Sequence, residues 1–437
     1  MAQHDQVISD GPGAQVRADM NAAFAAIFSS SSGPTEPLVK KAGQLWFDTT
    51  LGVLNLRDPT NGAWQPMPIA ANVYTKAQTD AAIAASTPRW ARPRNHIINP
   101  ACQVSQENAN TASASAATQT TPYYAADQWG VLWSLTGTAN AQRKQSADSG
   151  SDYVSLNIVT ATPTPASSAR AEIAQDIEGL QVKEFNWFTD GGGKDAVLRF
   201  NFYASVAGIY TAFIRGPSWS YFVNFTASVG WKVYSFAIPA PAGSTASTWP
   251  KDNTKCMTVG VGLASGAGFQ AIGSGWQQTN QACQAPGASN GAATAGASFG
   301  LTDVGLYLDP DKTGGAPPFN VPDYEDDLVK CRRYWWCSNP ITPKGSGIGT
   351  LSGHSGTANV ICFGTWRFTV PMRIAPPFTI WNNGVQNQVR VTLTGAVINT
   401  GNPGTNYLSS EGGCLVGVTS LAASQWIDFD MTVNARM

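Results

Sequence analysis

Apolar and polar positions alternate with a period of two through much of the chain after residue 150. Residues 154–158 place Val, Leu and Ile at alternate positions, and residues 198–202 do the same with Leu, Phe and Phe. Each stretch is typical of a strand with one face in a core. Similar stretches follow at residues 209–215, 221–226, 231–238, 257–263 and 299–308. About eight strands with no helical period among them predict an antiparallel β-sandwich.

The alternation returns near the C-terminus, at residues 366–370, 389–393 and 427–433. We expect a second, smaller β-sandwich there, or a continuation of the first. Within the larger body, Trp129, Trp133 and Trp231 lie inside or against strand patterns, so we assign them to the core. The tract at residues 284–298 is rich in Gly, Ala and Ser. It predicts a mobile loop.

A different pattern comes first in the chain. Apolar residues at helical spacing over residues 16–28 predict an amphipathic helix that ends at a Ser-rich turn. Three short strand-like segments follow at residues 44–48, 53–57 and 63–67 and predict a meander. This small α+β unit has little apolar content and would gain from burial against a partner.

A short helix is expected over residues 73–85. Thr75 and Gln78 have the spacing of a capping box, and Pro88 limits the helix to about three turns, which is marginal in isolation. Small residues, Ala77 and Ala81 among them, form one face that suits a parallel bundle around a symmetry axis. The alternative is a short helical linker packed on its own chain.

Composition excludes several classes of protein. The chain has 437 residues, which allows about three domains. Only 13% of the residues are charged, and the net charge is −1. We therefore expect no nucleic-acid partner. The chain contains no run of 18 apolar residues, so we expect no membrane insertion. The first residues lack the features of a signal peptide, so we do not expect export by the general secretory route.

The cysteines and histidines do not predict a metal site or a cofactor. None of the seven cysteines forms a Cys-x-x-Cys pair, and the three histidines are far apart in sequence. Most of the cysteines are expected to be buried thiols. Cys331 and Cys337 flank one predicted strand, roughly 20 Å apart and too far for a bridge. The sequence leaves a pairing of Cys256 with Cys283 open.

The acidic run at residues 323–327 is the one place where paired carboxylates suggest catalysis. We favour a structural role, because Asp323 is placed to cap a short helix whose other end carries Lys330. The chain also lacks the repeat of 20–30 residues that builds a β-helix. We expect no catalytic residues and no enzymatic activity.

Aromatic content is the remaining chemical signal, with 15 tryptophans. An aromatic face packs against the C–H surface of a sugar ring, while nearby amides satisfy the hydroxyl groups. Candidate glycan-binding residues near loops are Trp187, Trp219, Tyr221 and Trp276. Core packing is the competing interpretation for each.

Several motifs carry a resemblance to a known family. They are Gly-Gln-Leu-Trp-Phe-Asp-Thr-Thr at residues 43–50, Tyr-Thr-Lys-Ala-Gln at 74–78, Cys-Arg-Arg-Tyr-Trp-Trp at 331–336 and Val-Pro-Met-Arg-Ile-Ala-Pro-Pro at 370–377. The chain resembles the tail-fibre and spike adsorption proteins of tailed phages that have a jelly roll like those of carbohydrate-binding modules. The resemblance covers most of the chain.

The resemblance implies four regions. These are a particle-attachment module at residues 1–72, a helical linker for trimerisation at 73–94, a carbohydrate-binding-like jelly roll at 95–320 and a C-terminal β domain at 321–437. It also implies a homotrimer, made in the bacterial cytoplasm and assembled into a virion. Residues 1–72 would contact other virion structural proteins, and the jelly roll would bind a host surface polysaccharide for adsorption. The alternatives are a polysaccharide depolymerase spike with acids from the loops, and a purely structural virion decoration.

Overall fold

The computed structural model of the chain describes residues 4–5, 7–67, 93–113, 119–145, 151–188, 192–241, 249–338, 351–357, 360–362, 366–383, 385–392, 394–399, 409–413 and 425–437. The chain divides into two compact units, Met1–Arg92 and Pro93–Met437. The helix expected over residues 73–85 lies outside the described residues.

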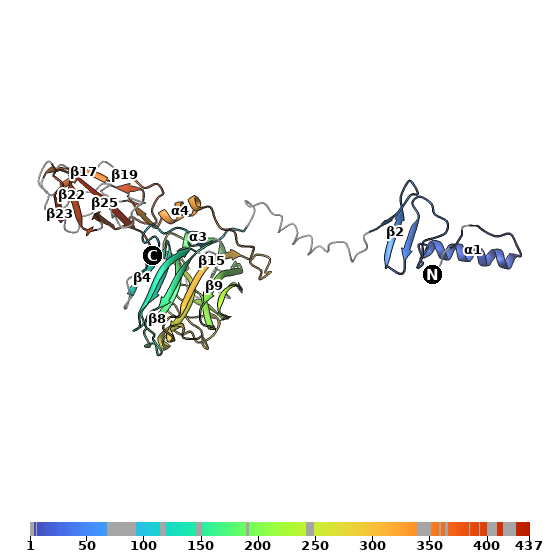
Figure 1. Cartoon of the computed structure of the whole chain (residues 1–437), viewed down its shortest axis with the longest axis horizontal. Coiled ribbons are helices and arrows are strands. Elements are labelled where there is room, and N and C mark those ends of the chain that lie inside the picture. The colour runs from blue at the N-terminus through green and yellow to red at the C-terminus, as the bar shows by residue number, and fades with distance from the viewer. Residues whose placement is uncertain are drawn as a thin grey trace. The chain divides into compact units, whose positions relative to one another are not determined.

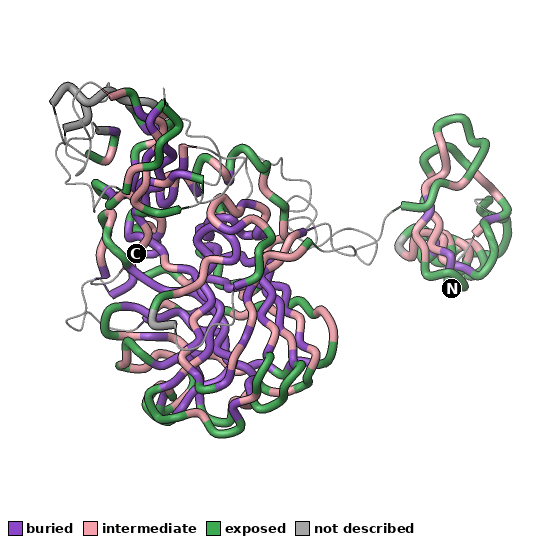
Figure 2. Tube along the Cα trace, turned by 60° about the vertical axis from the view of Figure 1, so that its left-hand side comes forward, coloured by how far each residue is buried: buried purple, intermediate pink, exposed green. Residues whose placement is uncertain are grey.

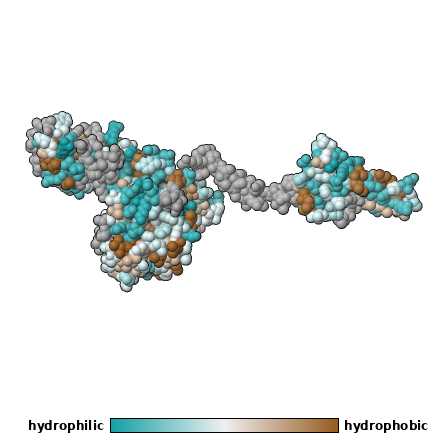
Figure 3. Space-filling view, viewed as in Figure 1, coloured by the Kyte–Doolittle hydropathy of each residue, from teal (hydrophilic) through white to brown (hydrophobic). Residues whose placement is uncertain are grey.

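The first unit contains the predicted helix and meander. Helix α1 (Gly13–Phe28) is followed by antiparallel strands β1 (Leu45–Asp48), β2 (Val53–Arg57) and β3 (Trp64–Pro66). The rings of Trp46 and Trp64 meet with centroids 5.4 Å apart. The unit buries little apolar surface, because Met20, Phe24 and Ile27 of α1 are all exposed. Figure 3 shows hydrophobic atoms on the surface of this unit.

The second unit contains the predicted sandwich, built from two antiparallel sheets (Figure 1). Within the described residues, the first sheet has seven strands in the order β14 (Gly275–Gln277), β11 (Ser220–Ala227), β10 (Gly208–Arg215), β13 (Lys255–Ser265), β8 (Arg170–Glu178), β5 (Trp129–Trp133) and β4 (Gln119–Ala126). The second has five, in the order β12 (Gly230–Ile238), β9 (Ala196–Ala204), β15 (Ser298–Leu308), β7 (Asp152–Ile158) and β6 (Ala139–Gln145). The strands predicted from alternation are confirmed, and β4, β5, β6, β8 and β14 are additional.

The main core lies between these sheets, where Figure 2 shows the tube as buried. Trp129 and Trp133 are fully buried there, as expected. Trp231 does not lie in the core, against our expectation. It stands directly opposite Tyr203 on the outer face of the five-stranded sheet and is only half-buried. The strand pattern around Trp231 was right, but the residue points to the opposite face.

The Gly- and Ala-rich tract at residues 284–298 differs from the mobile loop we expected. It holds the short 3₁₀ helix η4 (Gly291–Ala293), and its Ala285, Ala292 and Ala297 are buried. Small side chains let this backbone pack closely against the sandwich. Cys256 and Cys283 are both buried free thiols, so the pairing left open by the sequence does not form.

Short helices α3 (Gly179–Val182), η2 (Lys183–Phe185) and η3 (Ala267–Phe269) connect strands. Helix α4 (Tyr324–Arg332) begins where predicted, with the Asp323 side chain accepting a hydrogen bond from the Glu325 backbone N–H at 3.0 Å. The strand expected over residues 331–336 is wrong in its first half. The helix continues through Cys331, and only β16 (Trp335–Cys337) is a strand.

The C-terminal region forms a separate sheet with its own small core. Its strands, within the described residues, are β16, β17 (Leu351–Thr357), β18 (Val360–Cys362), β20 (Phe378–Asn382), β21 (Val385–Gln386), β22 (Gln388–Val391), β23 (Val397–Asn399) and β25 (Trp426–Asn434), with β19 (Trp366–Arg367) and β24 (Gly412–Gly413) pairing apart. The strand expected at residues 366–370 ends at Arg367, and the one expected at 389–393 ends at Val391. The terminal strand is confirmed as β25, which pairs with β16, β17, β20 and β22.

Buried ion pairs join this region to the sandwich. Arg333 donates from Nε and Nη2 to the two carboxylate oxygens of Glu178, at 2.9 and 3.2 Å. Arg436 is buried and pairs with Glu107 and Asp127. The predicted domain boundary between residues 320 and 321 stays a prediction.

Candidate functional site

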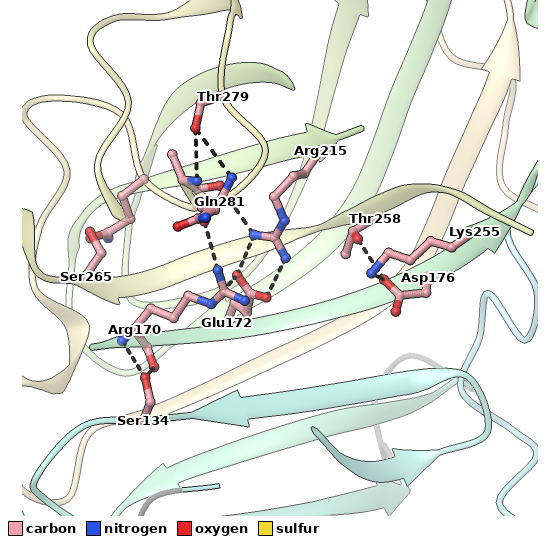
Figure 4. Close-up of polar contacts among 12 residues, drawn as sticks. Ser134, Arg170, Glu172, Asp176, Arg215, Lys255, Thr258, Ser265, Thr279 and Gln281 are labelled. Atoms are coloured by element: carbon pink, nitrogen blue, oxygen red, sulfur yellow. Dashed lines mark hydrogen bonds and ion pairs between the residues drawn. The ribbon is translucent and has the colours of Figure 1, made fainter. Parts of the chain in front are cut away.

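The candidate site lies on the outer face of the seven-stranded sheet, and strand β8 supplies its centre. Ala171, Ile173 and Ile177 of β8 point into the core. The intervening Glu172 and Asp176 therefore point outward, because side chains alternate along a strand. Figure 4 shows Glu172 meeting Arg215 of β10, and Asp176 meeting Lys255 and Thr258 of the neighbouring strand β13.

A groove runs over this face, formed by two adjoining cavities of about 230 and 250 Å³. Both cavities are lined by Arg215, Lys255 and Thr258, so they adjoin. The first also reaches Gly130 of β5 and Ala174 of β8. The lining of the first cavity draws on strands β4, β5, β8, β10 and β13, so the hollow crosses several strands of the sheet.

Glu172 and Arg215 form a bidentate pair at the base of the groove. Nη2 and Nη1 of Arg215 donate to the two Glu172 carboxylate oxygens at 2.7 and 2.9 Å. Both residues are buried, with Glu172 4% exposed. Burial alone would raise the pKa of Glu172, but the charge of Arg215 outweighs it and lowers that pKa. The pair is therefore a fixed, charged element of the site.

Three further charged groups are held along the groove. Asp176 Oδ1 accepts hydrogen bonds from Lys255 Nζ and from the Thr258 hydroxyl, each at 2.7 Å. Arg170 donates from Nη1 to the carbonyl of Gln281 at 2.8 Å, and its guanidinium lies over the Phe269 ring. Three cations therefore alternate with two carboxylates, and the lining is close to neutral.

Gln128 provides a donor with no hydrogen-bond partner among the described residues. It lines the groove, is 3% exposed and adopts a left-handed backbone (φ 69°) in the turn between β4 and β5. Within the described part of the chain, its Nε2 is buried and makes no hydrogen bond. Buried polar groups are nearly always paired, so this amide is available to a bound molecule.

This arrangement suits recognition better than hydrolysis. A sugar hydroxyl both donates and accepts, and the groove offers fixed carboxylate acceptors beside cationic and amide donors. Glu172 and Asp176 are four residues apart on one strand, so their positions differ by roughly 13 Å. Glycosidase carboxyl pairs lie about 5 to 9.5 Å apart. No cluster of His, Cys, Asp and Glu that could hold a metal occurs among the described residues.

The four aromatic residues predicted from sequence lie together, but at a different place. Trp276 contacts Trp187 and Tyr221, with ring centroids 5.3 and 5.4 Å apart, and Trp219 joins them through Phe188. Trp187 is 3% exposed, so its ring is not accessible to a sugar, against our expectation. Trp219, Tyr221 and Trp276 are partly buried against the core. A glycan-binding role for these three stays a prediction.

The sequence interpretation missed every charged residue of the groove. A signal for β8 was present, since Ala171, Ile173 and Ile177 alternate with polar positions. The alternation is interrupted by Gln175, which occupies an inward position and is satisfied by the backbone N–H and C=O of Ile98. The unpartnered amide of Gln128 depends on packing and has no signature in sequence.

Comparisons with known proteins place the chain in no family. No protein-family model matches it, and no curated protein matches it. Among solved structures, it is similar to one described as "CBM4 structure and function", with 14% identity over 42% of this chain and 95% of that one, at a TM-score of 0.22. It is also similar to the CBM22-1 xylan-binding domain from Paenibacillus barcinonensis, with 9% identity over 46% of this chain and 96% of that one, at a TM-score of 0.21.

A third similar structure is the enzymatically active domain of tailspike protein 4 of Bacteriophage CBA120, at 13% identity and a TM-score of 0.22. The match covers 42% of this chain but 19% of that one. At TM-scores this low, the three likenesses say nothing further about this chain.

No helix among the described residues is long and apolar enough to cross a membrane.

Proposed function

We propose that the chain is a non-enzymatic adsorption protein of a phage or phage-like particle, and that its groove binds a bacterial surface polysaccharide. The groove carries the binding part of this proposal. It crosses several strands, is close to neutral and is lined by fixed donors and acceptors, and its Gln128 amide lacks a partner within the described residues. The motifs at residues 43–50 and 74–78 support the proposal that the chain belongs to a phage or phage-like particle.

Replacing Gln128 with methionine tests the groove. The change keeps the length of the side chain and removes the unpartnered donor, so we expect roughly fivefold weaker binding to the polysaccharide and no loss of stability. Lys255→Ala should weaken binding by a similar factor. Binding is measured by affinity electrophoresis of the full chain through gels containing purified capsular polysaccharides or lipopolysaccharides, and stability by the thermal midpoint.

Lys312→Ala is the matched control, because Lys312 is an exposed lysine that lies outside the groove lining. It should bind like the unmodified chain. Unchanged binding by both groove variants, to a polysaccharide that the unmodified chain binds, would contradict the site. A large drop in the thermal midpoint of Gln128→Met would show that the amide has a structural partner instead.

We also propose that the chain is a homotrimer that docks on other virion proteins through residues 1–72. The apolar face of α1, formed by Met20, Phe24 and Ile27, is exposed in the single chain and would be covered by such contacts. Light scattering of the purified chain should give about three times 46.1 kDa. A stable monomer at micromolar concentration would remove the trimer from the proposal.

A further inference from the structure

The outer face of the five-stranded sheet carries an aromatic surface on the side of the sandwich opposite the groove. Trp231 of β12 stands opposite Tyr203 of β9, and Tyr203 stands opposite Gly300 of β15. Tyr153 of β7 completes the set. The rings of Tyr153 and Tyr203 both contact Trp231, with centroids 5.0 and 5.5 Å away. We call Tyr153, Tyr203 and Trp231 the aromatic platform.

Gly300 allows the platform to close. A Cβ atom at this position would lie 2.9 Å from Trp231, 3.1 Å from Tyr153 and 3.2 Å from Tyr203. Because glycine has no side chain, the three rings approach one another over the backbone of β15 and form one continuous surface. All three are only half-buried, so the platform remains accessible.

Two buried acceptor atoms that have no hydrogen-bond partner among the described residues lie on the same face. Asn201 lies one outward position before Tyr203 on β9, is 9% exposed and has an Oδ1 atom that accepts no hydrogen bond from any described residue. Asp303 lies at a register shift in β15, where its backbone φ is 51°. Its Oδ1 atom also has no hydrogen-bond partner among the described residues. Bulges of this kind re-aim side chains and are frequent beside binding sites.

We propose that this face is a second carbohydrate-binding site, in which a sugar ring stacks on the aromatic platform and its hydroxyl groups donate to Asn201 and Asp303. Aromatic faces take up the C–H surface of a sugar, and each unpartnered acceptor matches one hydroxyl donor. The platform itself carries no charge, which suits an uncharged sugar unit. This inference is independent of the groove, because the two sites share no residue.

The test uses the full chain and affinity electrophoresis with dextran, xylan, mannan and purified bacterial capsular polysaccharides. For each polysaccharide that binds the platform, Trp231→Ala and Tyr203→Ala should weaken binding by about fivefold to tenfold. Trp231→Phe keeps a ring and should retain most of the affinity. Asn201→Ala keeps all three rings of the aromatic platform and should still weaken binding. This variant therefore tests the site even if Trp231→Ala does not fold.

The Gln128→Met variant distinguishes binding at the groove from binding at the aromatic platform. If the platform variants bind every polysaccharide as the unmodified chain does, the second site is wrong whatever Gln128→Met shows. If the platform variants weaken binding and Gln128→Met does not, the platform stands and the groove proposal fails. A Trp231→Phe variant as weak as Trp231→Ala would also overturn stacking as the mode of binding.

Discussion

Replacing Arg215 with methionine is expected to lower the free energy of unfolding by about 3–5 kcal/mol. The change leaves Glu172 buried, with Arg170 at 3.7 Å as its remaining cation. An uncompensated buried charge is costly, whereas a pair replaced by apolar residues is often nearly neutral. Urea unfolding of the single variant and of the double variant Glu172→Met/Arg215→Met measures both, and the double variant should recover most of the loss.

The pH dependence gives an independent check of this pair. The folded-state pKa of Glu172 is lowered by Arg215, so its contribution to stability is present above the unfolded pKa and is lost as the pH falls through the folded pKa. Without Arg215, burial of Glu172 is opposed only by the weaker effects of Arg170 and Lys255 on its pKa, so the variant gains less stability than the unmodified chain from ionising this carboxyl as the pH rises. The deficit of Arg215→Met should therefore be larger at neutral than at acid pH. A deficit below about 1 kcal/mol at neutral pH would contradict the buried pair.

Replacing Trp129 with alanine is expected to cost about 3–5 kcal/mol. Trp129 is fully buried between the sheets, and its indole N–H donates to the carbonyl of Asn99 at 2.8 Å. The substitution leaves a large cavity and an unpaired carbonyl. Urea unfolding or the shift in thermal midpoint measures the loss.

Trp231→Ala is the matched control for Trp129→Ala, because both tryptophans lie in strands of the sandwich, Trp129 on an inner face and Trp231 on an outer face. Trp231 is half-buried on the outer face, so its loss should cost well under half as much. Equal losses at the two positions would mean that the five-stranded sheet has been assigned the wrong inward face.

Local alternation was enough to predict the sandwich, because strands such as β9 place Leu198, Phe200 and Phe202 on one face without interruption. The cap at Asp323 was also predictable, since it depends on residues within one turn. The end of α4 was not, because Cys331 and Tyr334 pack with Ile98 and Val104 from a distant segment. That contact is invisible in the local pattern.

The candidate sites were harder to predict than the fold. An aromatic residue near a loop gives no indication of which sheet face it occupies, and Trp187 is core whereas Trp231 is surface. The groove depends on pairing across strands distant in sequence, as between Glu172 and Arg215. Unpartnered atoms such as Gln128 Nε2 are set by packing alone.

The central claim is that the chain binds a polysaccharide through its groove without cleaving it. The most direct measurement mixes the purified chain, or its Gln128→Met variant, with purified surface polysaccharide of a bacterium that adsorbs it, and follows both binding and polysaccharide chain length by size-exclusion chromatography. We predict a complex with the unmodified chain, a weaker complex with the variant, and constant chain length. Steady shortening of the polysaccharide, or a variant that binds as tightly as the unmodified chain, would contradict the account.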